Sequence, residues 1–129
     1  MAKIEKVSPL APVQFPNIPE IDGVEFSTAA AGIKYQDRTD LMLAILDPGT
    51  EIAGVFTSSS TRSYAVIDCE KKIRLKDNTT GAAIIVNSGN ANAFTGFRGK
   101  VSVDAITSAL SDRLQICLLY TSPSPRDRG

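Results

Sequence analysis

The residues best suited to chemistry gather in one stretch, Asn87 to Gly96, directly after an apolar run. The stretch holds three asparagines, a serine, a threonine and two glycines. In α/β proteins, sites are built where the chain leaves a strand of the sheet. The candidate site residues are therefore Asn87, Ser88, Gly89, Asn90 and Asn92. The alternative is a turn whose amide side chains bond within their own loop, which is the commoner role for any single asparagine.

The composition excludes several other kinds of chemistry. Histidine is absent, so the commonest general base and the commonest zinc ligand are missing. The glycine spacing fits neither a phosphate-binding loop nor a dinucleotide fingerprint. We therefore expect hydroxyl, amide, carboxylate and backbone groups to do any chemistry, with no metal and no resident cofactor.

Charge and hydropathy exclude further classes of protein. The chain has 129 residues, with 14 basic and 14 acidic side chains, so nothing favours binding to nucleic acid or to an anionic membrane. The longest apolar run, Leu41 to Leu46, is too short to cross a bilayer. Met1 to Lys6 lacks the apolar segment of a secretory leader, and two cysteines make no disulfide framework. We expect a cytoplasmic protein.

The elements that must position the candidate site are strands and two short helices. Turn residues bound several apolar runs, and the apolar period changes to that of a helix after Thr61 and again near Val101. The strands are predicted at 24–29, 41–46, 52–57 and 82–86, with the third paired to the second across Asp47 to Thr50. The predicted buried helix positions are Val66, Cys69 and Ile73, then Val103, Ile106, Leu110 and Leu114. The fold class is thus α/β, in mixed layers of sheet and helix.

The two ends of the chain differ from this middle part. Residues 1–23 include four prolines between Pro9 and Pro19 and are predicted to form an extended arm that lies against something, since apolar residues stand between the prolines. Residues 24–116 form the folded part. Residues 117–129 change abruptly to an apolar triplet and a Ser/Pro/Arg string. This last segment resembles the translation of an adaptor used in transposon-based sequencing libraries, and we expect it to be non-native rather than a flexible tail.

Several segments, in order, resemble one family. They are Val7–Pro12, Ala29–Lys34, Arg38–Leu41, Ala53–Thr57, Thr61–Ser63 and, most distinctively, Val86–Gly96, which reads VNSGNANAFTG. Together they look like the N-terminal part of the bifunctional ornithine acetyltransferase/N-acetylglutamate synthase family of arginine biosynthesis. The resemblance covers 7–116 and implies part of a self-processing fold with an N-terminal threonine nucleophile.

The resemblance also implies an activity. Family members transfer an acetyl group from N2-acetylornithine to glutamate, and many also use acetyl-CoA as the donor. The precursor cuts itself before a threonine, whose hydroxyl becomes the nucleophile and whose α-amine becomes the base. A Thr-Gly pair forms the oxyanion hole. The implied partners are these small molecules and a second processed chain of the same precursor, in a heterotetramer.

None of the family's catalytic or substrate-binding residues has a counterpart here, because its motifs lie downstream of the second helix. Thr57, Thr61 and Thr95 are internal threonines without a free α-amine and are not assigned as nucleophiles. Lys34 is assigned a solvated or packing role. We expect an inactive fragment of the transferase, which is marginally stable because strands of the sheet lack their neighbours.

Two other functions stay open at this point. One is a small α/β module, complete at this length, that binds a polar ligand in the Asn-rich loop. The other is an amidohydrolase with the same self-processing fold, because such folds carry out both acyl transfer and amide hydrolysis. The sequence beyond Ile116 separates the first of these from the transferase, and dependence on an acyl acceptor separates the second.

Overall fold

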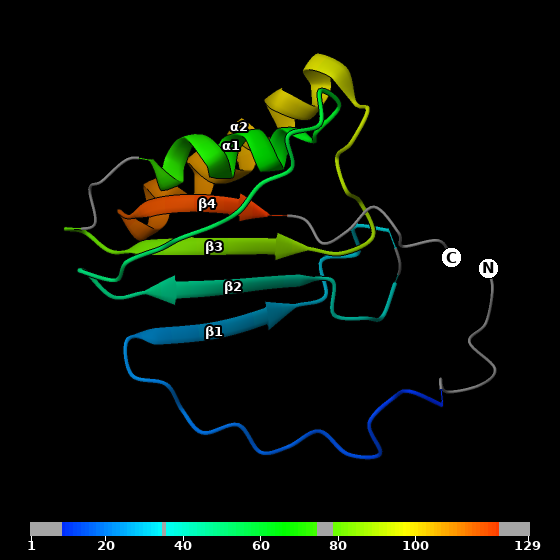
Figure 1. The fold of residues 1–129 in the computed structure, drawn as a ribbon, viewed down its shortest axis with the longest axis vertical. Helices are drawn as coiled ribbons and strands as arrows, with labels where there is room; N and C mark the ends of the chain where they lie inside the picture. The colour runs from blue at the N-terminus through cyan, green and yellow to red at the C-terminus, as the bar shows by residue number, and fades with distance from the viewer. Residues whose placement is uncertain (1–8, 35, 75–78, 122–129) are drawn as a thin grey trace.

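The computed structural model describes residues 9–34, 36–74 and 79–121, the last five by their backbone alone. A four-stranded sheet has the order β1-β2-β3-β4, and two helices pack beside its β3–β4 half (Figure 1). The strands are β1 (Val24–Ala29), β2 (Leu41–Leu46), β3 (Ala82–Asn87) and β4 (Cys117–Thr121), and the helices are α1 (Tyr64–Ile73) and α2 (Gly96–Leu114). The predicted α/β class is confirmed.

Pairing in the sheet is antiparallel except at its last strand. β1 pairs with β2 from Val24↔Leu46 to Ala29↔Leu41, and β2 pairs with β3 from Leu41↔Asn87 to Leu46↔Ala82. β3 and β4 run parallel, and α2 connects them as a crossover helix. The C-terminal ends of β1, β3 and β4 and the N-terminal end of β2 therefore lie together at one end of the sheet, which is the edge where the candidate site lies.

The core lies between the helices and one face of the sheet. Alternate residues of β3, Ala83 and Ile85, are buried against Ala65 of α1 and Val103 of α2. The half-buried residues around this cluster are Leu41, Leu43, Ile45, Tyr64, Leu110, Leu114 and Ile116. Period-2 alternation in the strands and period-3.6 spacing in the helices therefore produce one shared apolar layer.

The two helices differ at their first residues. The Ser63 side chain accepts a hydrogen bond from the backbone N–H of Val66 and caps α1, whose buried residues are Ala65 and Cys69. α2 begins at Gly96, five residues before the predicted start, and its N-cap residue Thr95 makes no side-chain cap hydrogen bond. Neither helix of the described part of the chain is long and apolar enough to cross a membrane.

Two details of the expected pattern are wrong. Residues 52–57 form no strand, because the central strand β2 takes β1 and β3 as its neighbours. On α2, Ile106 is 39% exposed, whereas Thr107 is buried and donates its hydroxyl to the Val103 carbonyl. That bond satisfies the hydroxyl inside the helix, so a threonine can occupy the buried position.

The sheet is covered unevenly. From Glu25 to Ala29 every residue of β1 is exposed, and Phe26 keeps 63% of its surface accessible. The face opposite the helices carries Met42, Ile84 and Val86 at half-buried positions, and neither helix of the described chain lies over it. The continuous apolar run of β2 is typical of a strand buried on both faces, but the helices cover it from one side only.

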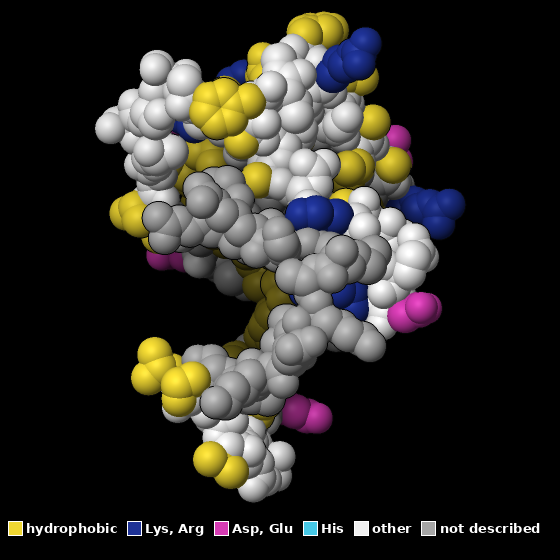
Figure 2. All heavy atoms as spheres, turned by 90° about the vertical axis from the view of Figure 1, so that its right-hand side faces the viewer, with side chains coloured by type: hydrophobic (Ala, Val, Ile, Leu, Met, Phe, Trp, Pro, Cys, Tyr) yellow, Lys and Arg dark blue, Asp and Glu magenta, His cyan; other side chains and the backbone are white. Residues whose placement is uncertain are grey.

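The apolar side chains in the described part of the arm, residues 9–23, do not pack on the body of this chain. They are exposed, with Phe15 at 82%, Ile18 at 78% and Ile21 at 59%. Figure 2 shows a hollow between the arm and the body, with hydrophobic side chains inside it. Residues 1–8 of the predicted arm and 122–129 of the predicted tail lie outside the described residues.

Candidate functional site

The predicted site residues lie at the edge of the sheet where β3 ends. Asn87 is the last residue of β3, and the loop that follows it reaches the start of α2 at Gly96 (Figure 1). Asn87 and Asn92 are buried, Ser88 and Gly89 are half-buried, and Asn90 is exposed. The structure thus brings the five candidate residues together in one compact loop.

The amide side chains of this loop form hydrogen bonds within the loop itself. The Asn87 Nδ2 donates to the Asn90 carbonyl at 2.8 Å, and the Asn90 Oδ1 accepts from the Asn92 N–H at 3.0 Å. Gly89 adopts φ +89°, Asn92 φ +49° and Phe94 φ +57°, so the loop enters the left-handed region three times before α2 begins. The asparagines therefore first hold the shape of the loop, as the turn interpretation predicts.

Asn92 also ties the loop to the first turn of α2. Its Nδ2 donates to the Gly99 carbonyl at 3.0 Å, and its Oδ1 accepts from the Thr95 hydroxyl at 2.9 Å. A Cβ at position 99 would lie 2.0 Å from the Thr95 Oγ1 and 2.9 Å from the Asn92 Oδ1. Glycine at 99 is therefore needed for this contact.

Asp40, which sequence reasoning did not select, connects this loop to the rest of the edge. It stands directly before β2 and is 3% exposed. Its carboxylate accepts the Ala31 N–H on Oδ1 and the Ile33 N–H on Oδ2, both at 2.6 Å. Its backbone N–H donates to the Ala29 carbonyl, and its carbonyl accepts the Ser88 N–H at 2.9 Å. One residue thus contacts both neighbouring connections.

The electrostatics of Asp40 follow from these contacts. Burial acts to raise the pKa of its carboxyl, but the backbone N–H groups of Ile33, Ala31, Asp40 itself and Gly32 lower it by more. The net pKa lies below the ordinary value of 3.8. The side chain is therefore an anion at neutral pH, and the backbone N–H dipoles stabilise its charge.

Lys34 packs on the loop through its aliphatic stem. A Cβ built at Gly89 would lie 2.8 Å from the Lys34 Cβ, so only glycine allows the two segments to approach this closely. Lys34 is exposed, as expected of a packing or solvated lysine. The segments Ala29–Lys34 and Asn87–Asn92 are therefore adjacent in space, although about 55 residues separate them in the chain.

The internal threonines form no nucleophilic arrangement. Thr57 and Thr61 lie on an exposed connection, where the Ser59 hydroxyl lies 3.0 Å from the Thr61 hydroxyl. The Thr95 hydroxyl donates to Asn92. Within the described residues no group of three or more His, Cys, Asp or Glu side chains is placed to hold a metal ion. The edge offers oriented amide, hydroxyl and carboxylate groups rather than an activated nucleophile.

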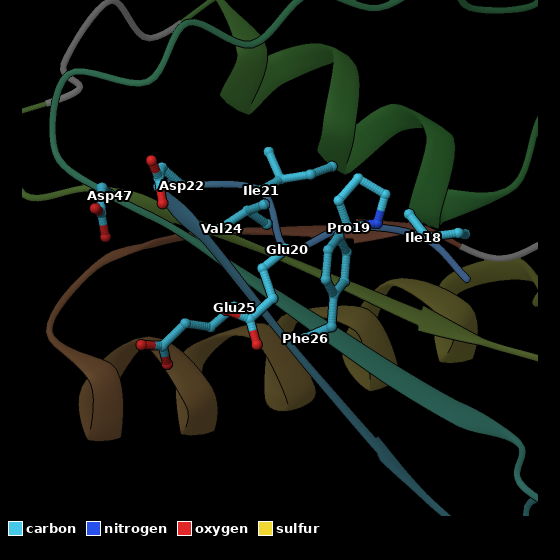
Figure 3. Close-up of a pocket in the computed structure, with 10 residues that line it drawn as sticks. Ile18, Pro19, Glu20, Ile21, Asp22, Val24, Glu25, Phe26 and Asp47 are labelled. Atoms are coloured by element: carbon cyan, nitrogen blue, oxygen red, sulfur yellow. The ribbon is translucent and has the colours of Figure 1, made fainter.

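A second concave region lies away from this edge. An open groove of about 840 Å³ separates the arm from β1, and Figure 3 shows its lining side chains. Its acidic residues are Glu20, Asp22, Glu25 and Asp47. It contains none of the candidate residues.

Comparison with known proteins gives one consistent family. The ArgJ family profile matches residues 25–122. The arginine biosynthesis bifunctional protein ArgJ of Ruegeria pomeroyi is 60% identical over 112 residues, which is 87% of this chain and 27% of that protein. The same-named protein of Nitrobacter winogradskyi is 56% identical over 97 residues, 73% of this chain and 23% of that protein. The chain thus spans about a quarter of these relatives.

Two solved structures share the fold. ArgJ of Bacillus halodurans superposes with a TM-score of 0.69 at 25% identity, over 78% of this chain and 53% of that one. The ornithine acetyltransferase of Mycobacterium tuberculosis, complexed with ornithine, gives 0.63 at 29% identity, over 83% and 59%. The match to the family extends to residue 122, beyond Ile116, where the motif resemblance was expected to end.

Proposed function

Because this chain belongs to the ArgJ family, we propose that it is part of an enzyme that transfers an acetyl group from N2-acetylornithine, or from acetyl-CoA, to glutamate in arginine biosynthesis. The observation that carries the proposal is the family match over residues 25–122, together with 60% identity to a bifunctional ArgJ protein. As a biosynthetic enzyme it would act in the cytoplasm. The product of the whole gene from which this chain derives is called the complete enzyme.

In the proposed reaction a threonine outside this chain acts as the nucleophile. Its hydroxyl oxygen attacks the acetyl carbonyl of acetylornithine while its α-amine takes the hydroxyl proton. The C–N bond to ornithine breaks, the proton passes to the leaving nitrogen, and an acetyl ester remains. The glutamate amine then attacks that ester and restores the threonine hydroxyl. We infer that the present chain is inactive because it holds no such terminal threonine.

The partner in this proposal is a second chain made from the same precursor. The present chain spans 27% of the R. pomeroyi protein but 53% and 59% of the two solved chains, so these solved chains are roughly half as long as that relative. Separate chains produced by cleavage account for the difference. The accessible face of the sheet opposite the helices is the surface that the second chain would cover. Pairing of two such units gives the heterotetramer.

The Asn87–Asn92 loop is proposed to line the acetyl-transfer site without providing the nucleophile. β3 and β4 are parallel, so β4 ends at the same end of the sheet as Asn87. The family's Thr-Gly oxyanion motif lies shortly downstream of the helix that corresponds to α2. The loop would then stand beside the oxyanion hole and fix its position.

We also propose that residues 117–129 derive from an adaptor. The change of composition after Ile116 supports this, because an apolar triplet and a Ser/Pro/Arg string follow it, and the family match overlaps this segment at residues 117–122 alone. Cys117–Thr121 is rich in apolar and aromatic residues, so pairing with the free edge of β3 suits it whatever its origin. Codons that continue from Ile116 into a Thr-Gly motif in the genomic DNA would support the proposal, whereas genomic codons for the present tail would refute it.

An acceptor-dependence assay of the complete enzyme tests the function. The enzyme is incubated with N2-acetylornithine, with and without glutamate, and both ornithine and N-acetylglutamate are quantified. The transferase proposal predicts equal amounts of the two products and no ornithine release without glutamate beyond one equivalent per site. Continuous ornithine release without glutamate would instead indicate the amidohydrolase. Binding without any turnover would favour the polar-ligand module.

A further inference from the structure

The edge of the sheet at the start of β2 contains a buried carboxylate to which the proposed chemistry assigns no part. Asp40 is 3% exposed, and within the described part of the chain its two carboxylate oxygens bind backbone N–H groups rather than side chains. Both accept backbone N–H groups of one turn, from Ala31 and from Ile33, at 2.6 Å each. Such charge-assisted bonds are short and directional, so they fix the orientation of that turn.

The same residue holds the loop that follows β3. The Asp40 carbonyl accepts the Ser88 N–H at 2.9 Å, one residue before Gly89. Gly89 in turn receives the stem of Lys34, which belongs to the turn that the carboxylate holds. Asp40, the Ala31–Lys34 turn and Ser88–Gly89 therefore form a closed ring of contacts, in which a shift of any one member moves the others.

We propose that Asp40 is a positioning residue for acetyl transfer: its carboxylate fixes the Ala31–Lys34 turn, and through Lys34 and its own carbonyl it sets the Asn87–Asn92 loop. This inference rests on the proposed function, which places that loop at the transfer site. Asp40 touches no reacting atom in this scheme. It acts by keeping the loop within the small displacement that catalysis tolerates.

The charge environment of Asp40 agrees with this role. The charged residues of its own connection are Lys34, Asp37 and Arg38, and the segment from Asn87 to Gly96 carries no charge. The backbone donors hold the pKa of the Asp40 carboxyl below its ordinary value, so the anion persists throughout the neutral range. The ring of contacts is therefore complete under the conditions of the reaction.

The test compares Asp40→Asn with Asp47→Asn in the complete enzyme. Asp47 follows the same strand, is exposed, and makes the same change of charge, so it is the matched control. In Asp40→Asn one amide N–H₂ replaces a carboxylate oxygen and faces a backbone N–H. We expect amide exchange in residues 29–34 to accelerate about tenfold or more, and kcat to fall about tenfold with KM for acetylornithine within about threefold.

Asp40→Glu keeps the carboxylate on a longer stem and serves as the second variant if Asp40→Asn fails to fold. It should restore part of kcat and part of the exchange protection. Exchange and kcat that match those of Asp47→Asn in both Asp40 variants would overturn the proposal. Two Asp40 variants that both fail to fold would also overturn it, since the role would then be structural.

The two proposals fail in distinguishable ways. If the wild-type enzyme transfers no acetyl group, the proposed function is wrong whatever the exchange data show. If the wild type transfers acetyl but exchange at 29–34 does not respond to Asp40→Asn, the function stands and the positioning role is wrong. A rise in KM with unchanged kcat would likewise contradict positioning at the transfer step.

Discussion

Aspartate flanks the middle strand of the sheet on both sides, Asp40 before Leu41 and Asp47 after Leu46. The backbone N–H groups of the two residues make equivalent hydrogen bonds. The Asp40 N–H donates to the Ala29 carbonyl at 3.1 Å, and the Asp47 N–H donates to the Gly23 carbonyl at 3.0 Å. The side chains differ. The Asp40 carboxylate is buried and bonded to two amides, whereas Asp47 is exposed at the start of a Pro-Gly turn.

This difference shows that strand pairing alone requires no buried carboxylate. At the Asp47 end a short turn of residues 47–50, closed by the Thr50 N–H on the Asp47 carbonyl, is sufficient. At the Asp40 end the chain buries a charge and uses it to hold a neighbouring turn and loop. Burying a carboxylate is costly unless it is bonded, so its presence marks the end of the sheet at which geometry has to be fixed.

The largest expected effect lies at the Asp47 end. Gly81 has φ +80°, and an added Cβ would lie 2.6 Å from the Leu46 carbonyl oxygen, which is a backbone atom and has little room to move. Gly81→Ala should therefore lower the local free energy of opening by about 2 kcal/mol or more, or roughly thirtyfold faster exchange of β3 amides. Amide exchange by mass spectrometry on the complete enzyme measures this. Unchanged exchange would mean that the Leu46 carbonyl can move to accommodate the added Cβ.

The glycine at the other end should be less sensitive to the same change. Gly89 has φ +89°, and an added Cβ would lie 2.8 Å from the Lys34 Cβ, a smaller overlap than the 2.6 Å approach to the Leu46 carbonyl oxygen at Gly81. We expect Gly89→Ala to lower the local opening free energy by about 1–2 kcal/mol. Faster exchange should extend to residues 29–34 as well, because Lys34 links the two segments. Faster exchange at residues 87–92 alone would show that Lys34 does not couple the two segments.

Loss of the Asn92 amide should have a smaller effect, limited to the start of α2. Asn92→Ala removes the bonds to the Gly99 carbonyl and the Thr95 hydroxyl. By analogy with the loss of a helix cap, we expect about 1 kcal/mol less local stability in 95–100. Ser108→Ala, at an exposed position of the same helix, is the control. Equal effects of the two changes would show that the buried contacts of Asn92 contribute nothing special.

Low pH should have the smallest effect, and it should weaken the Asp40 end of the sheet but not the Asp47 end. Because the folded-state pKa of Asp40 lies below that of the unfolded chain, its stabilisation is complete above about pH 4 and is lost as pH falls through the folded pKa. Exchange protection of residues 29–34, corrected for the intrinsic rate, should decline on acidification in the wild type and in Asp47→Asn. Asp40→Asn should show no such decline. The same acid response in all three proteins would assign it to another group.

The sequence predicted the regular elements better than the contacts between them. The apolar run Leu41–Leu46, bounded by turn residues, and the helix with Cys69 inside were located correctly. The prediction of a strand at 52–57 was wrong, because an apolar pattern does not show which segments pair with β2. At the site, the Asn-rich loop was located by composition. Asp40 was not, because its binding groups are backbone amides, which every residue carries.

The kinetic comparison of Asp40→Asn with Asp47→Asn in the complete enzyme tests most directly whether the Asp40 end of the sheet serves the proposed acetyl transfer. With N2-acetylornithine and glutamate as substrates, we expect a wild-type kcat for Asp47→Asn. We expect a kcat reduced about tenfold for Asp40→Asn, at nearly unchanged KM. Equal kcat values for the two variants, or a loss that appears only in KM, would contradict it.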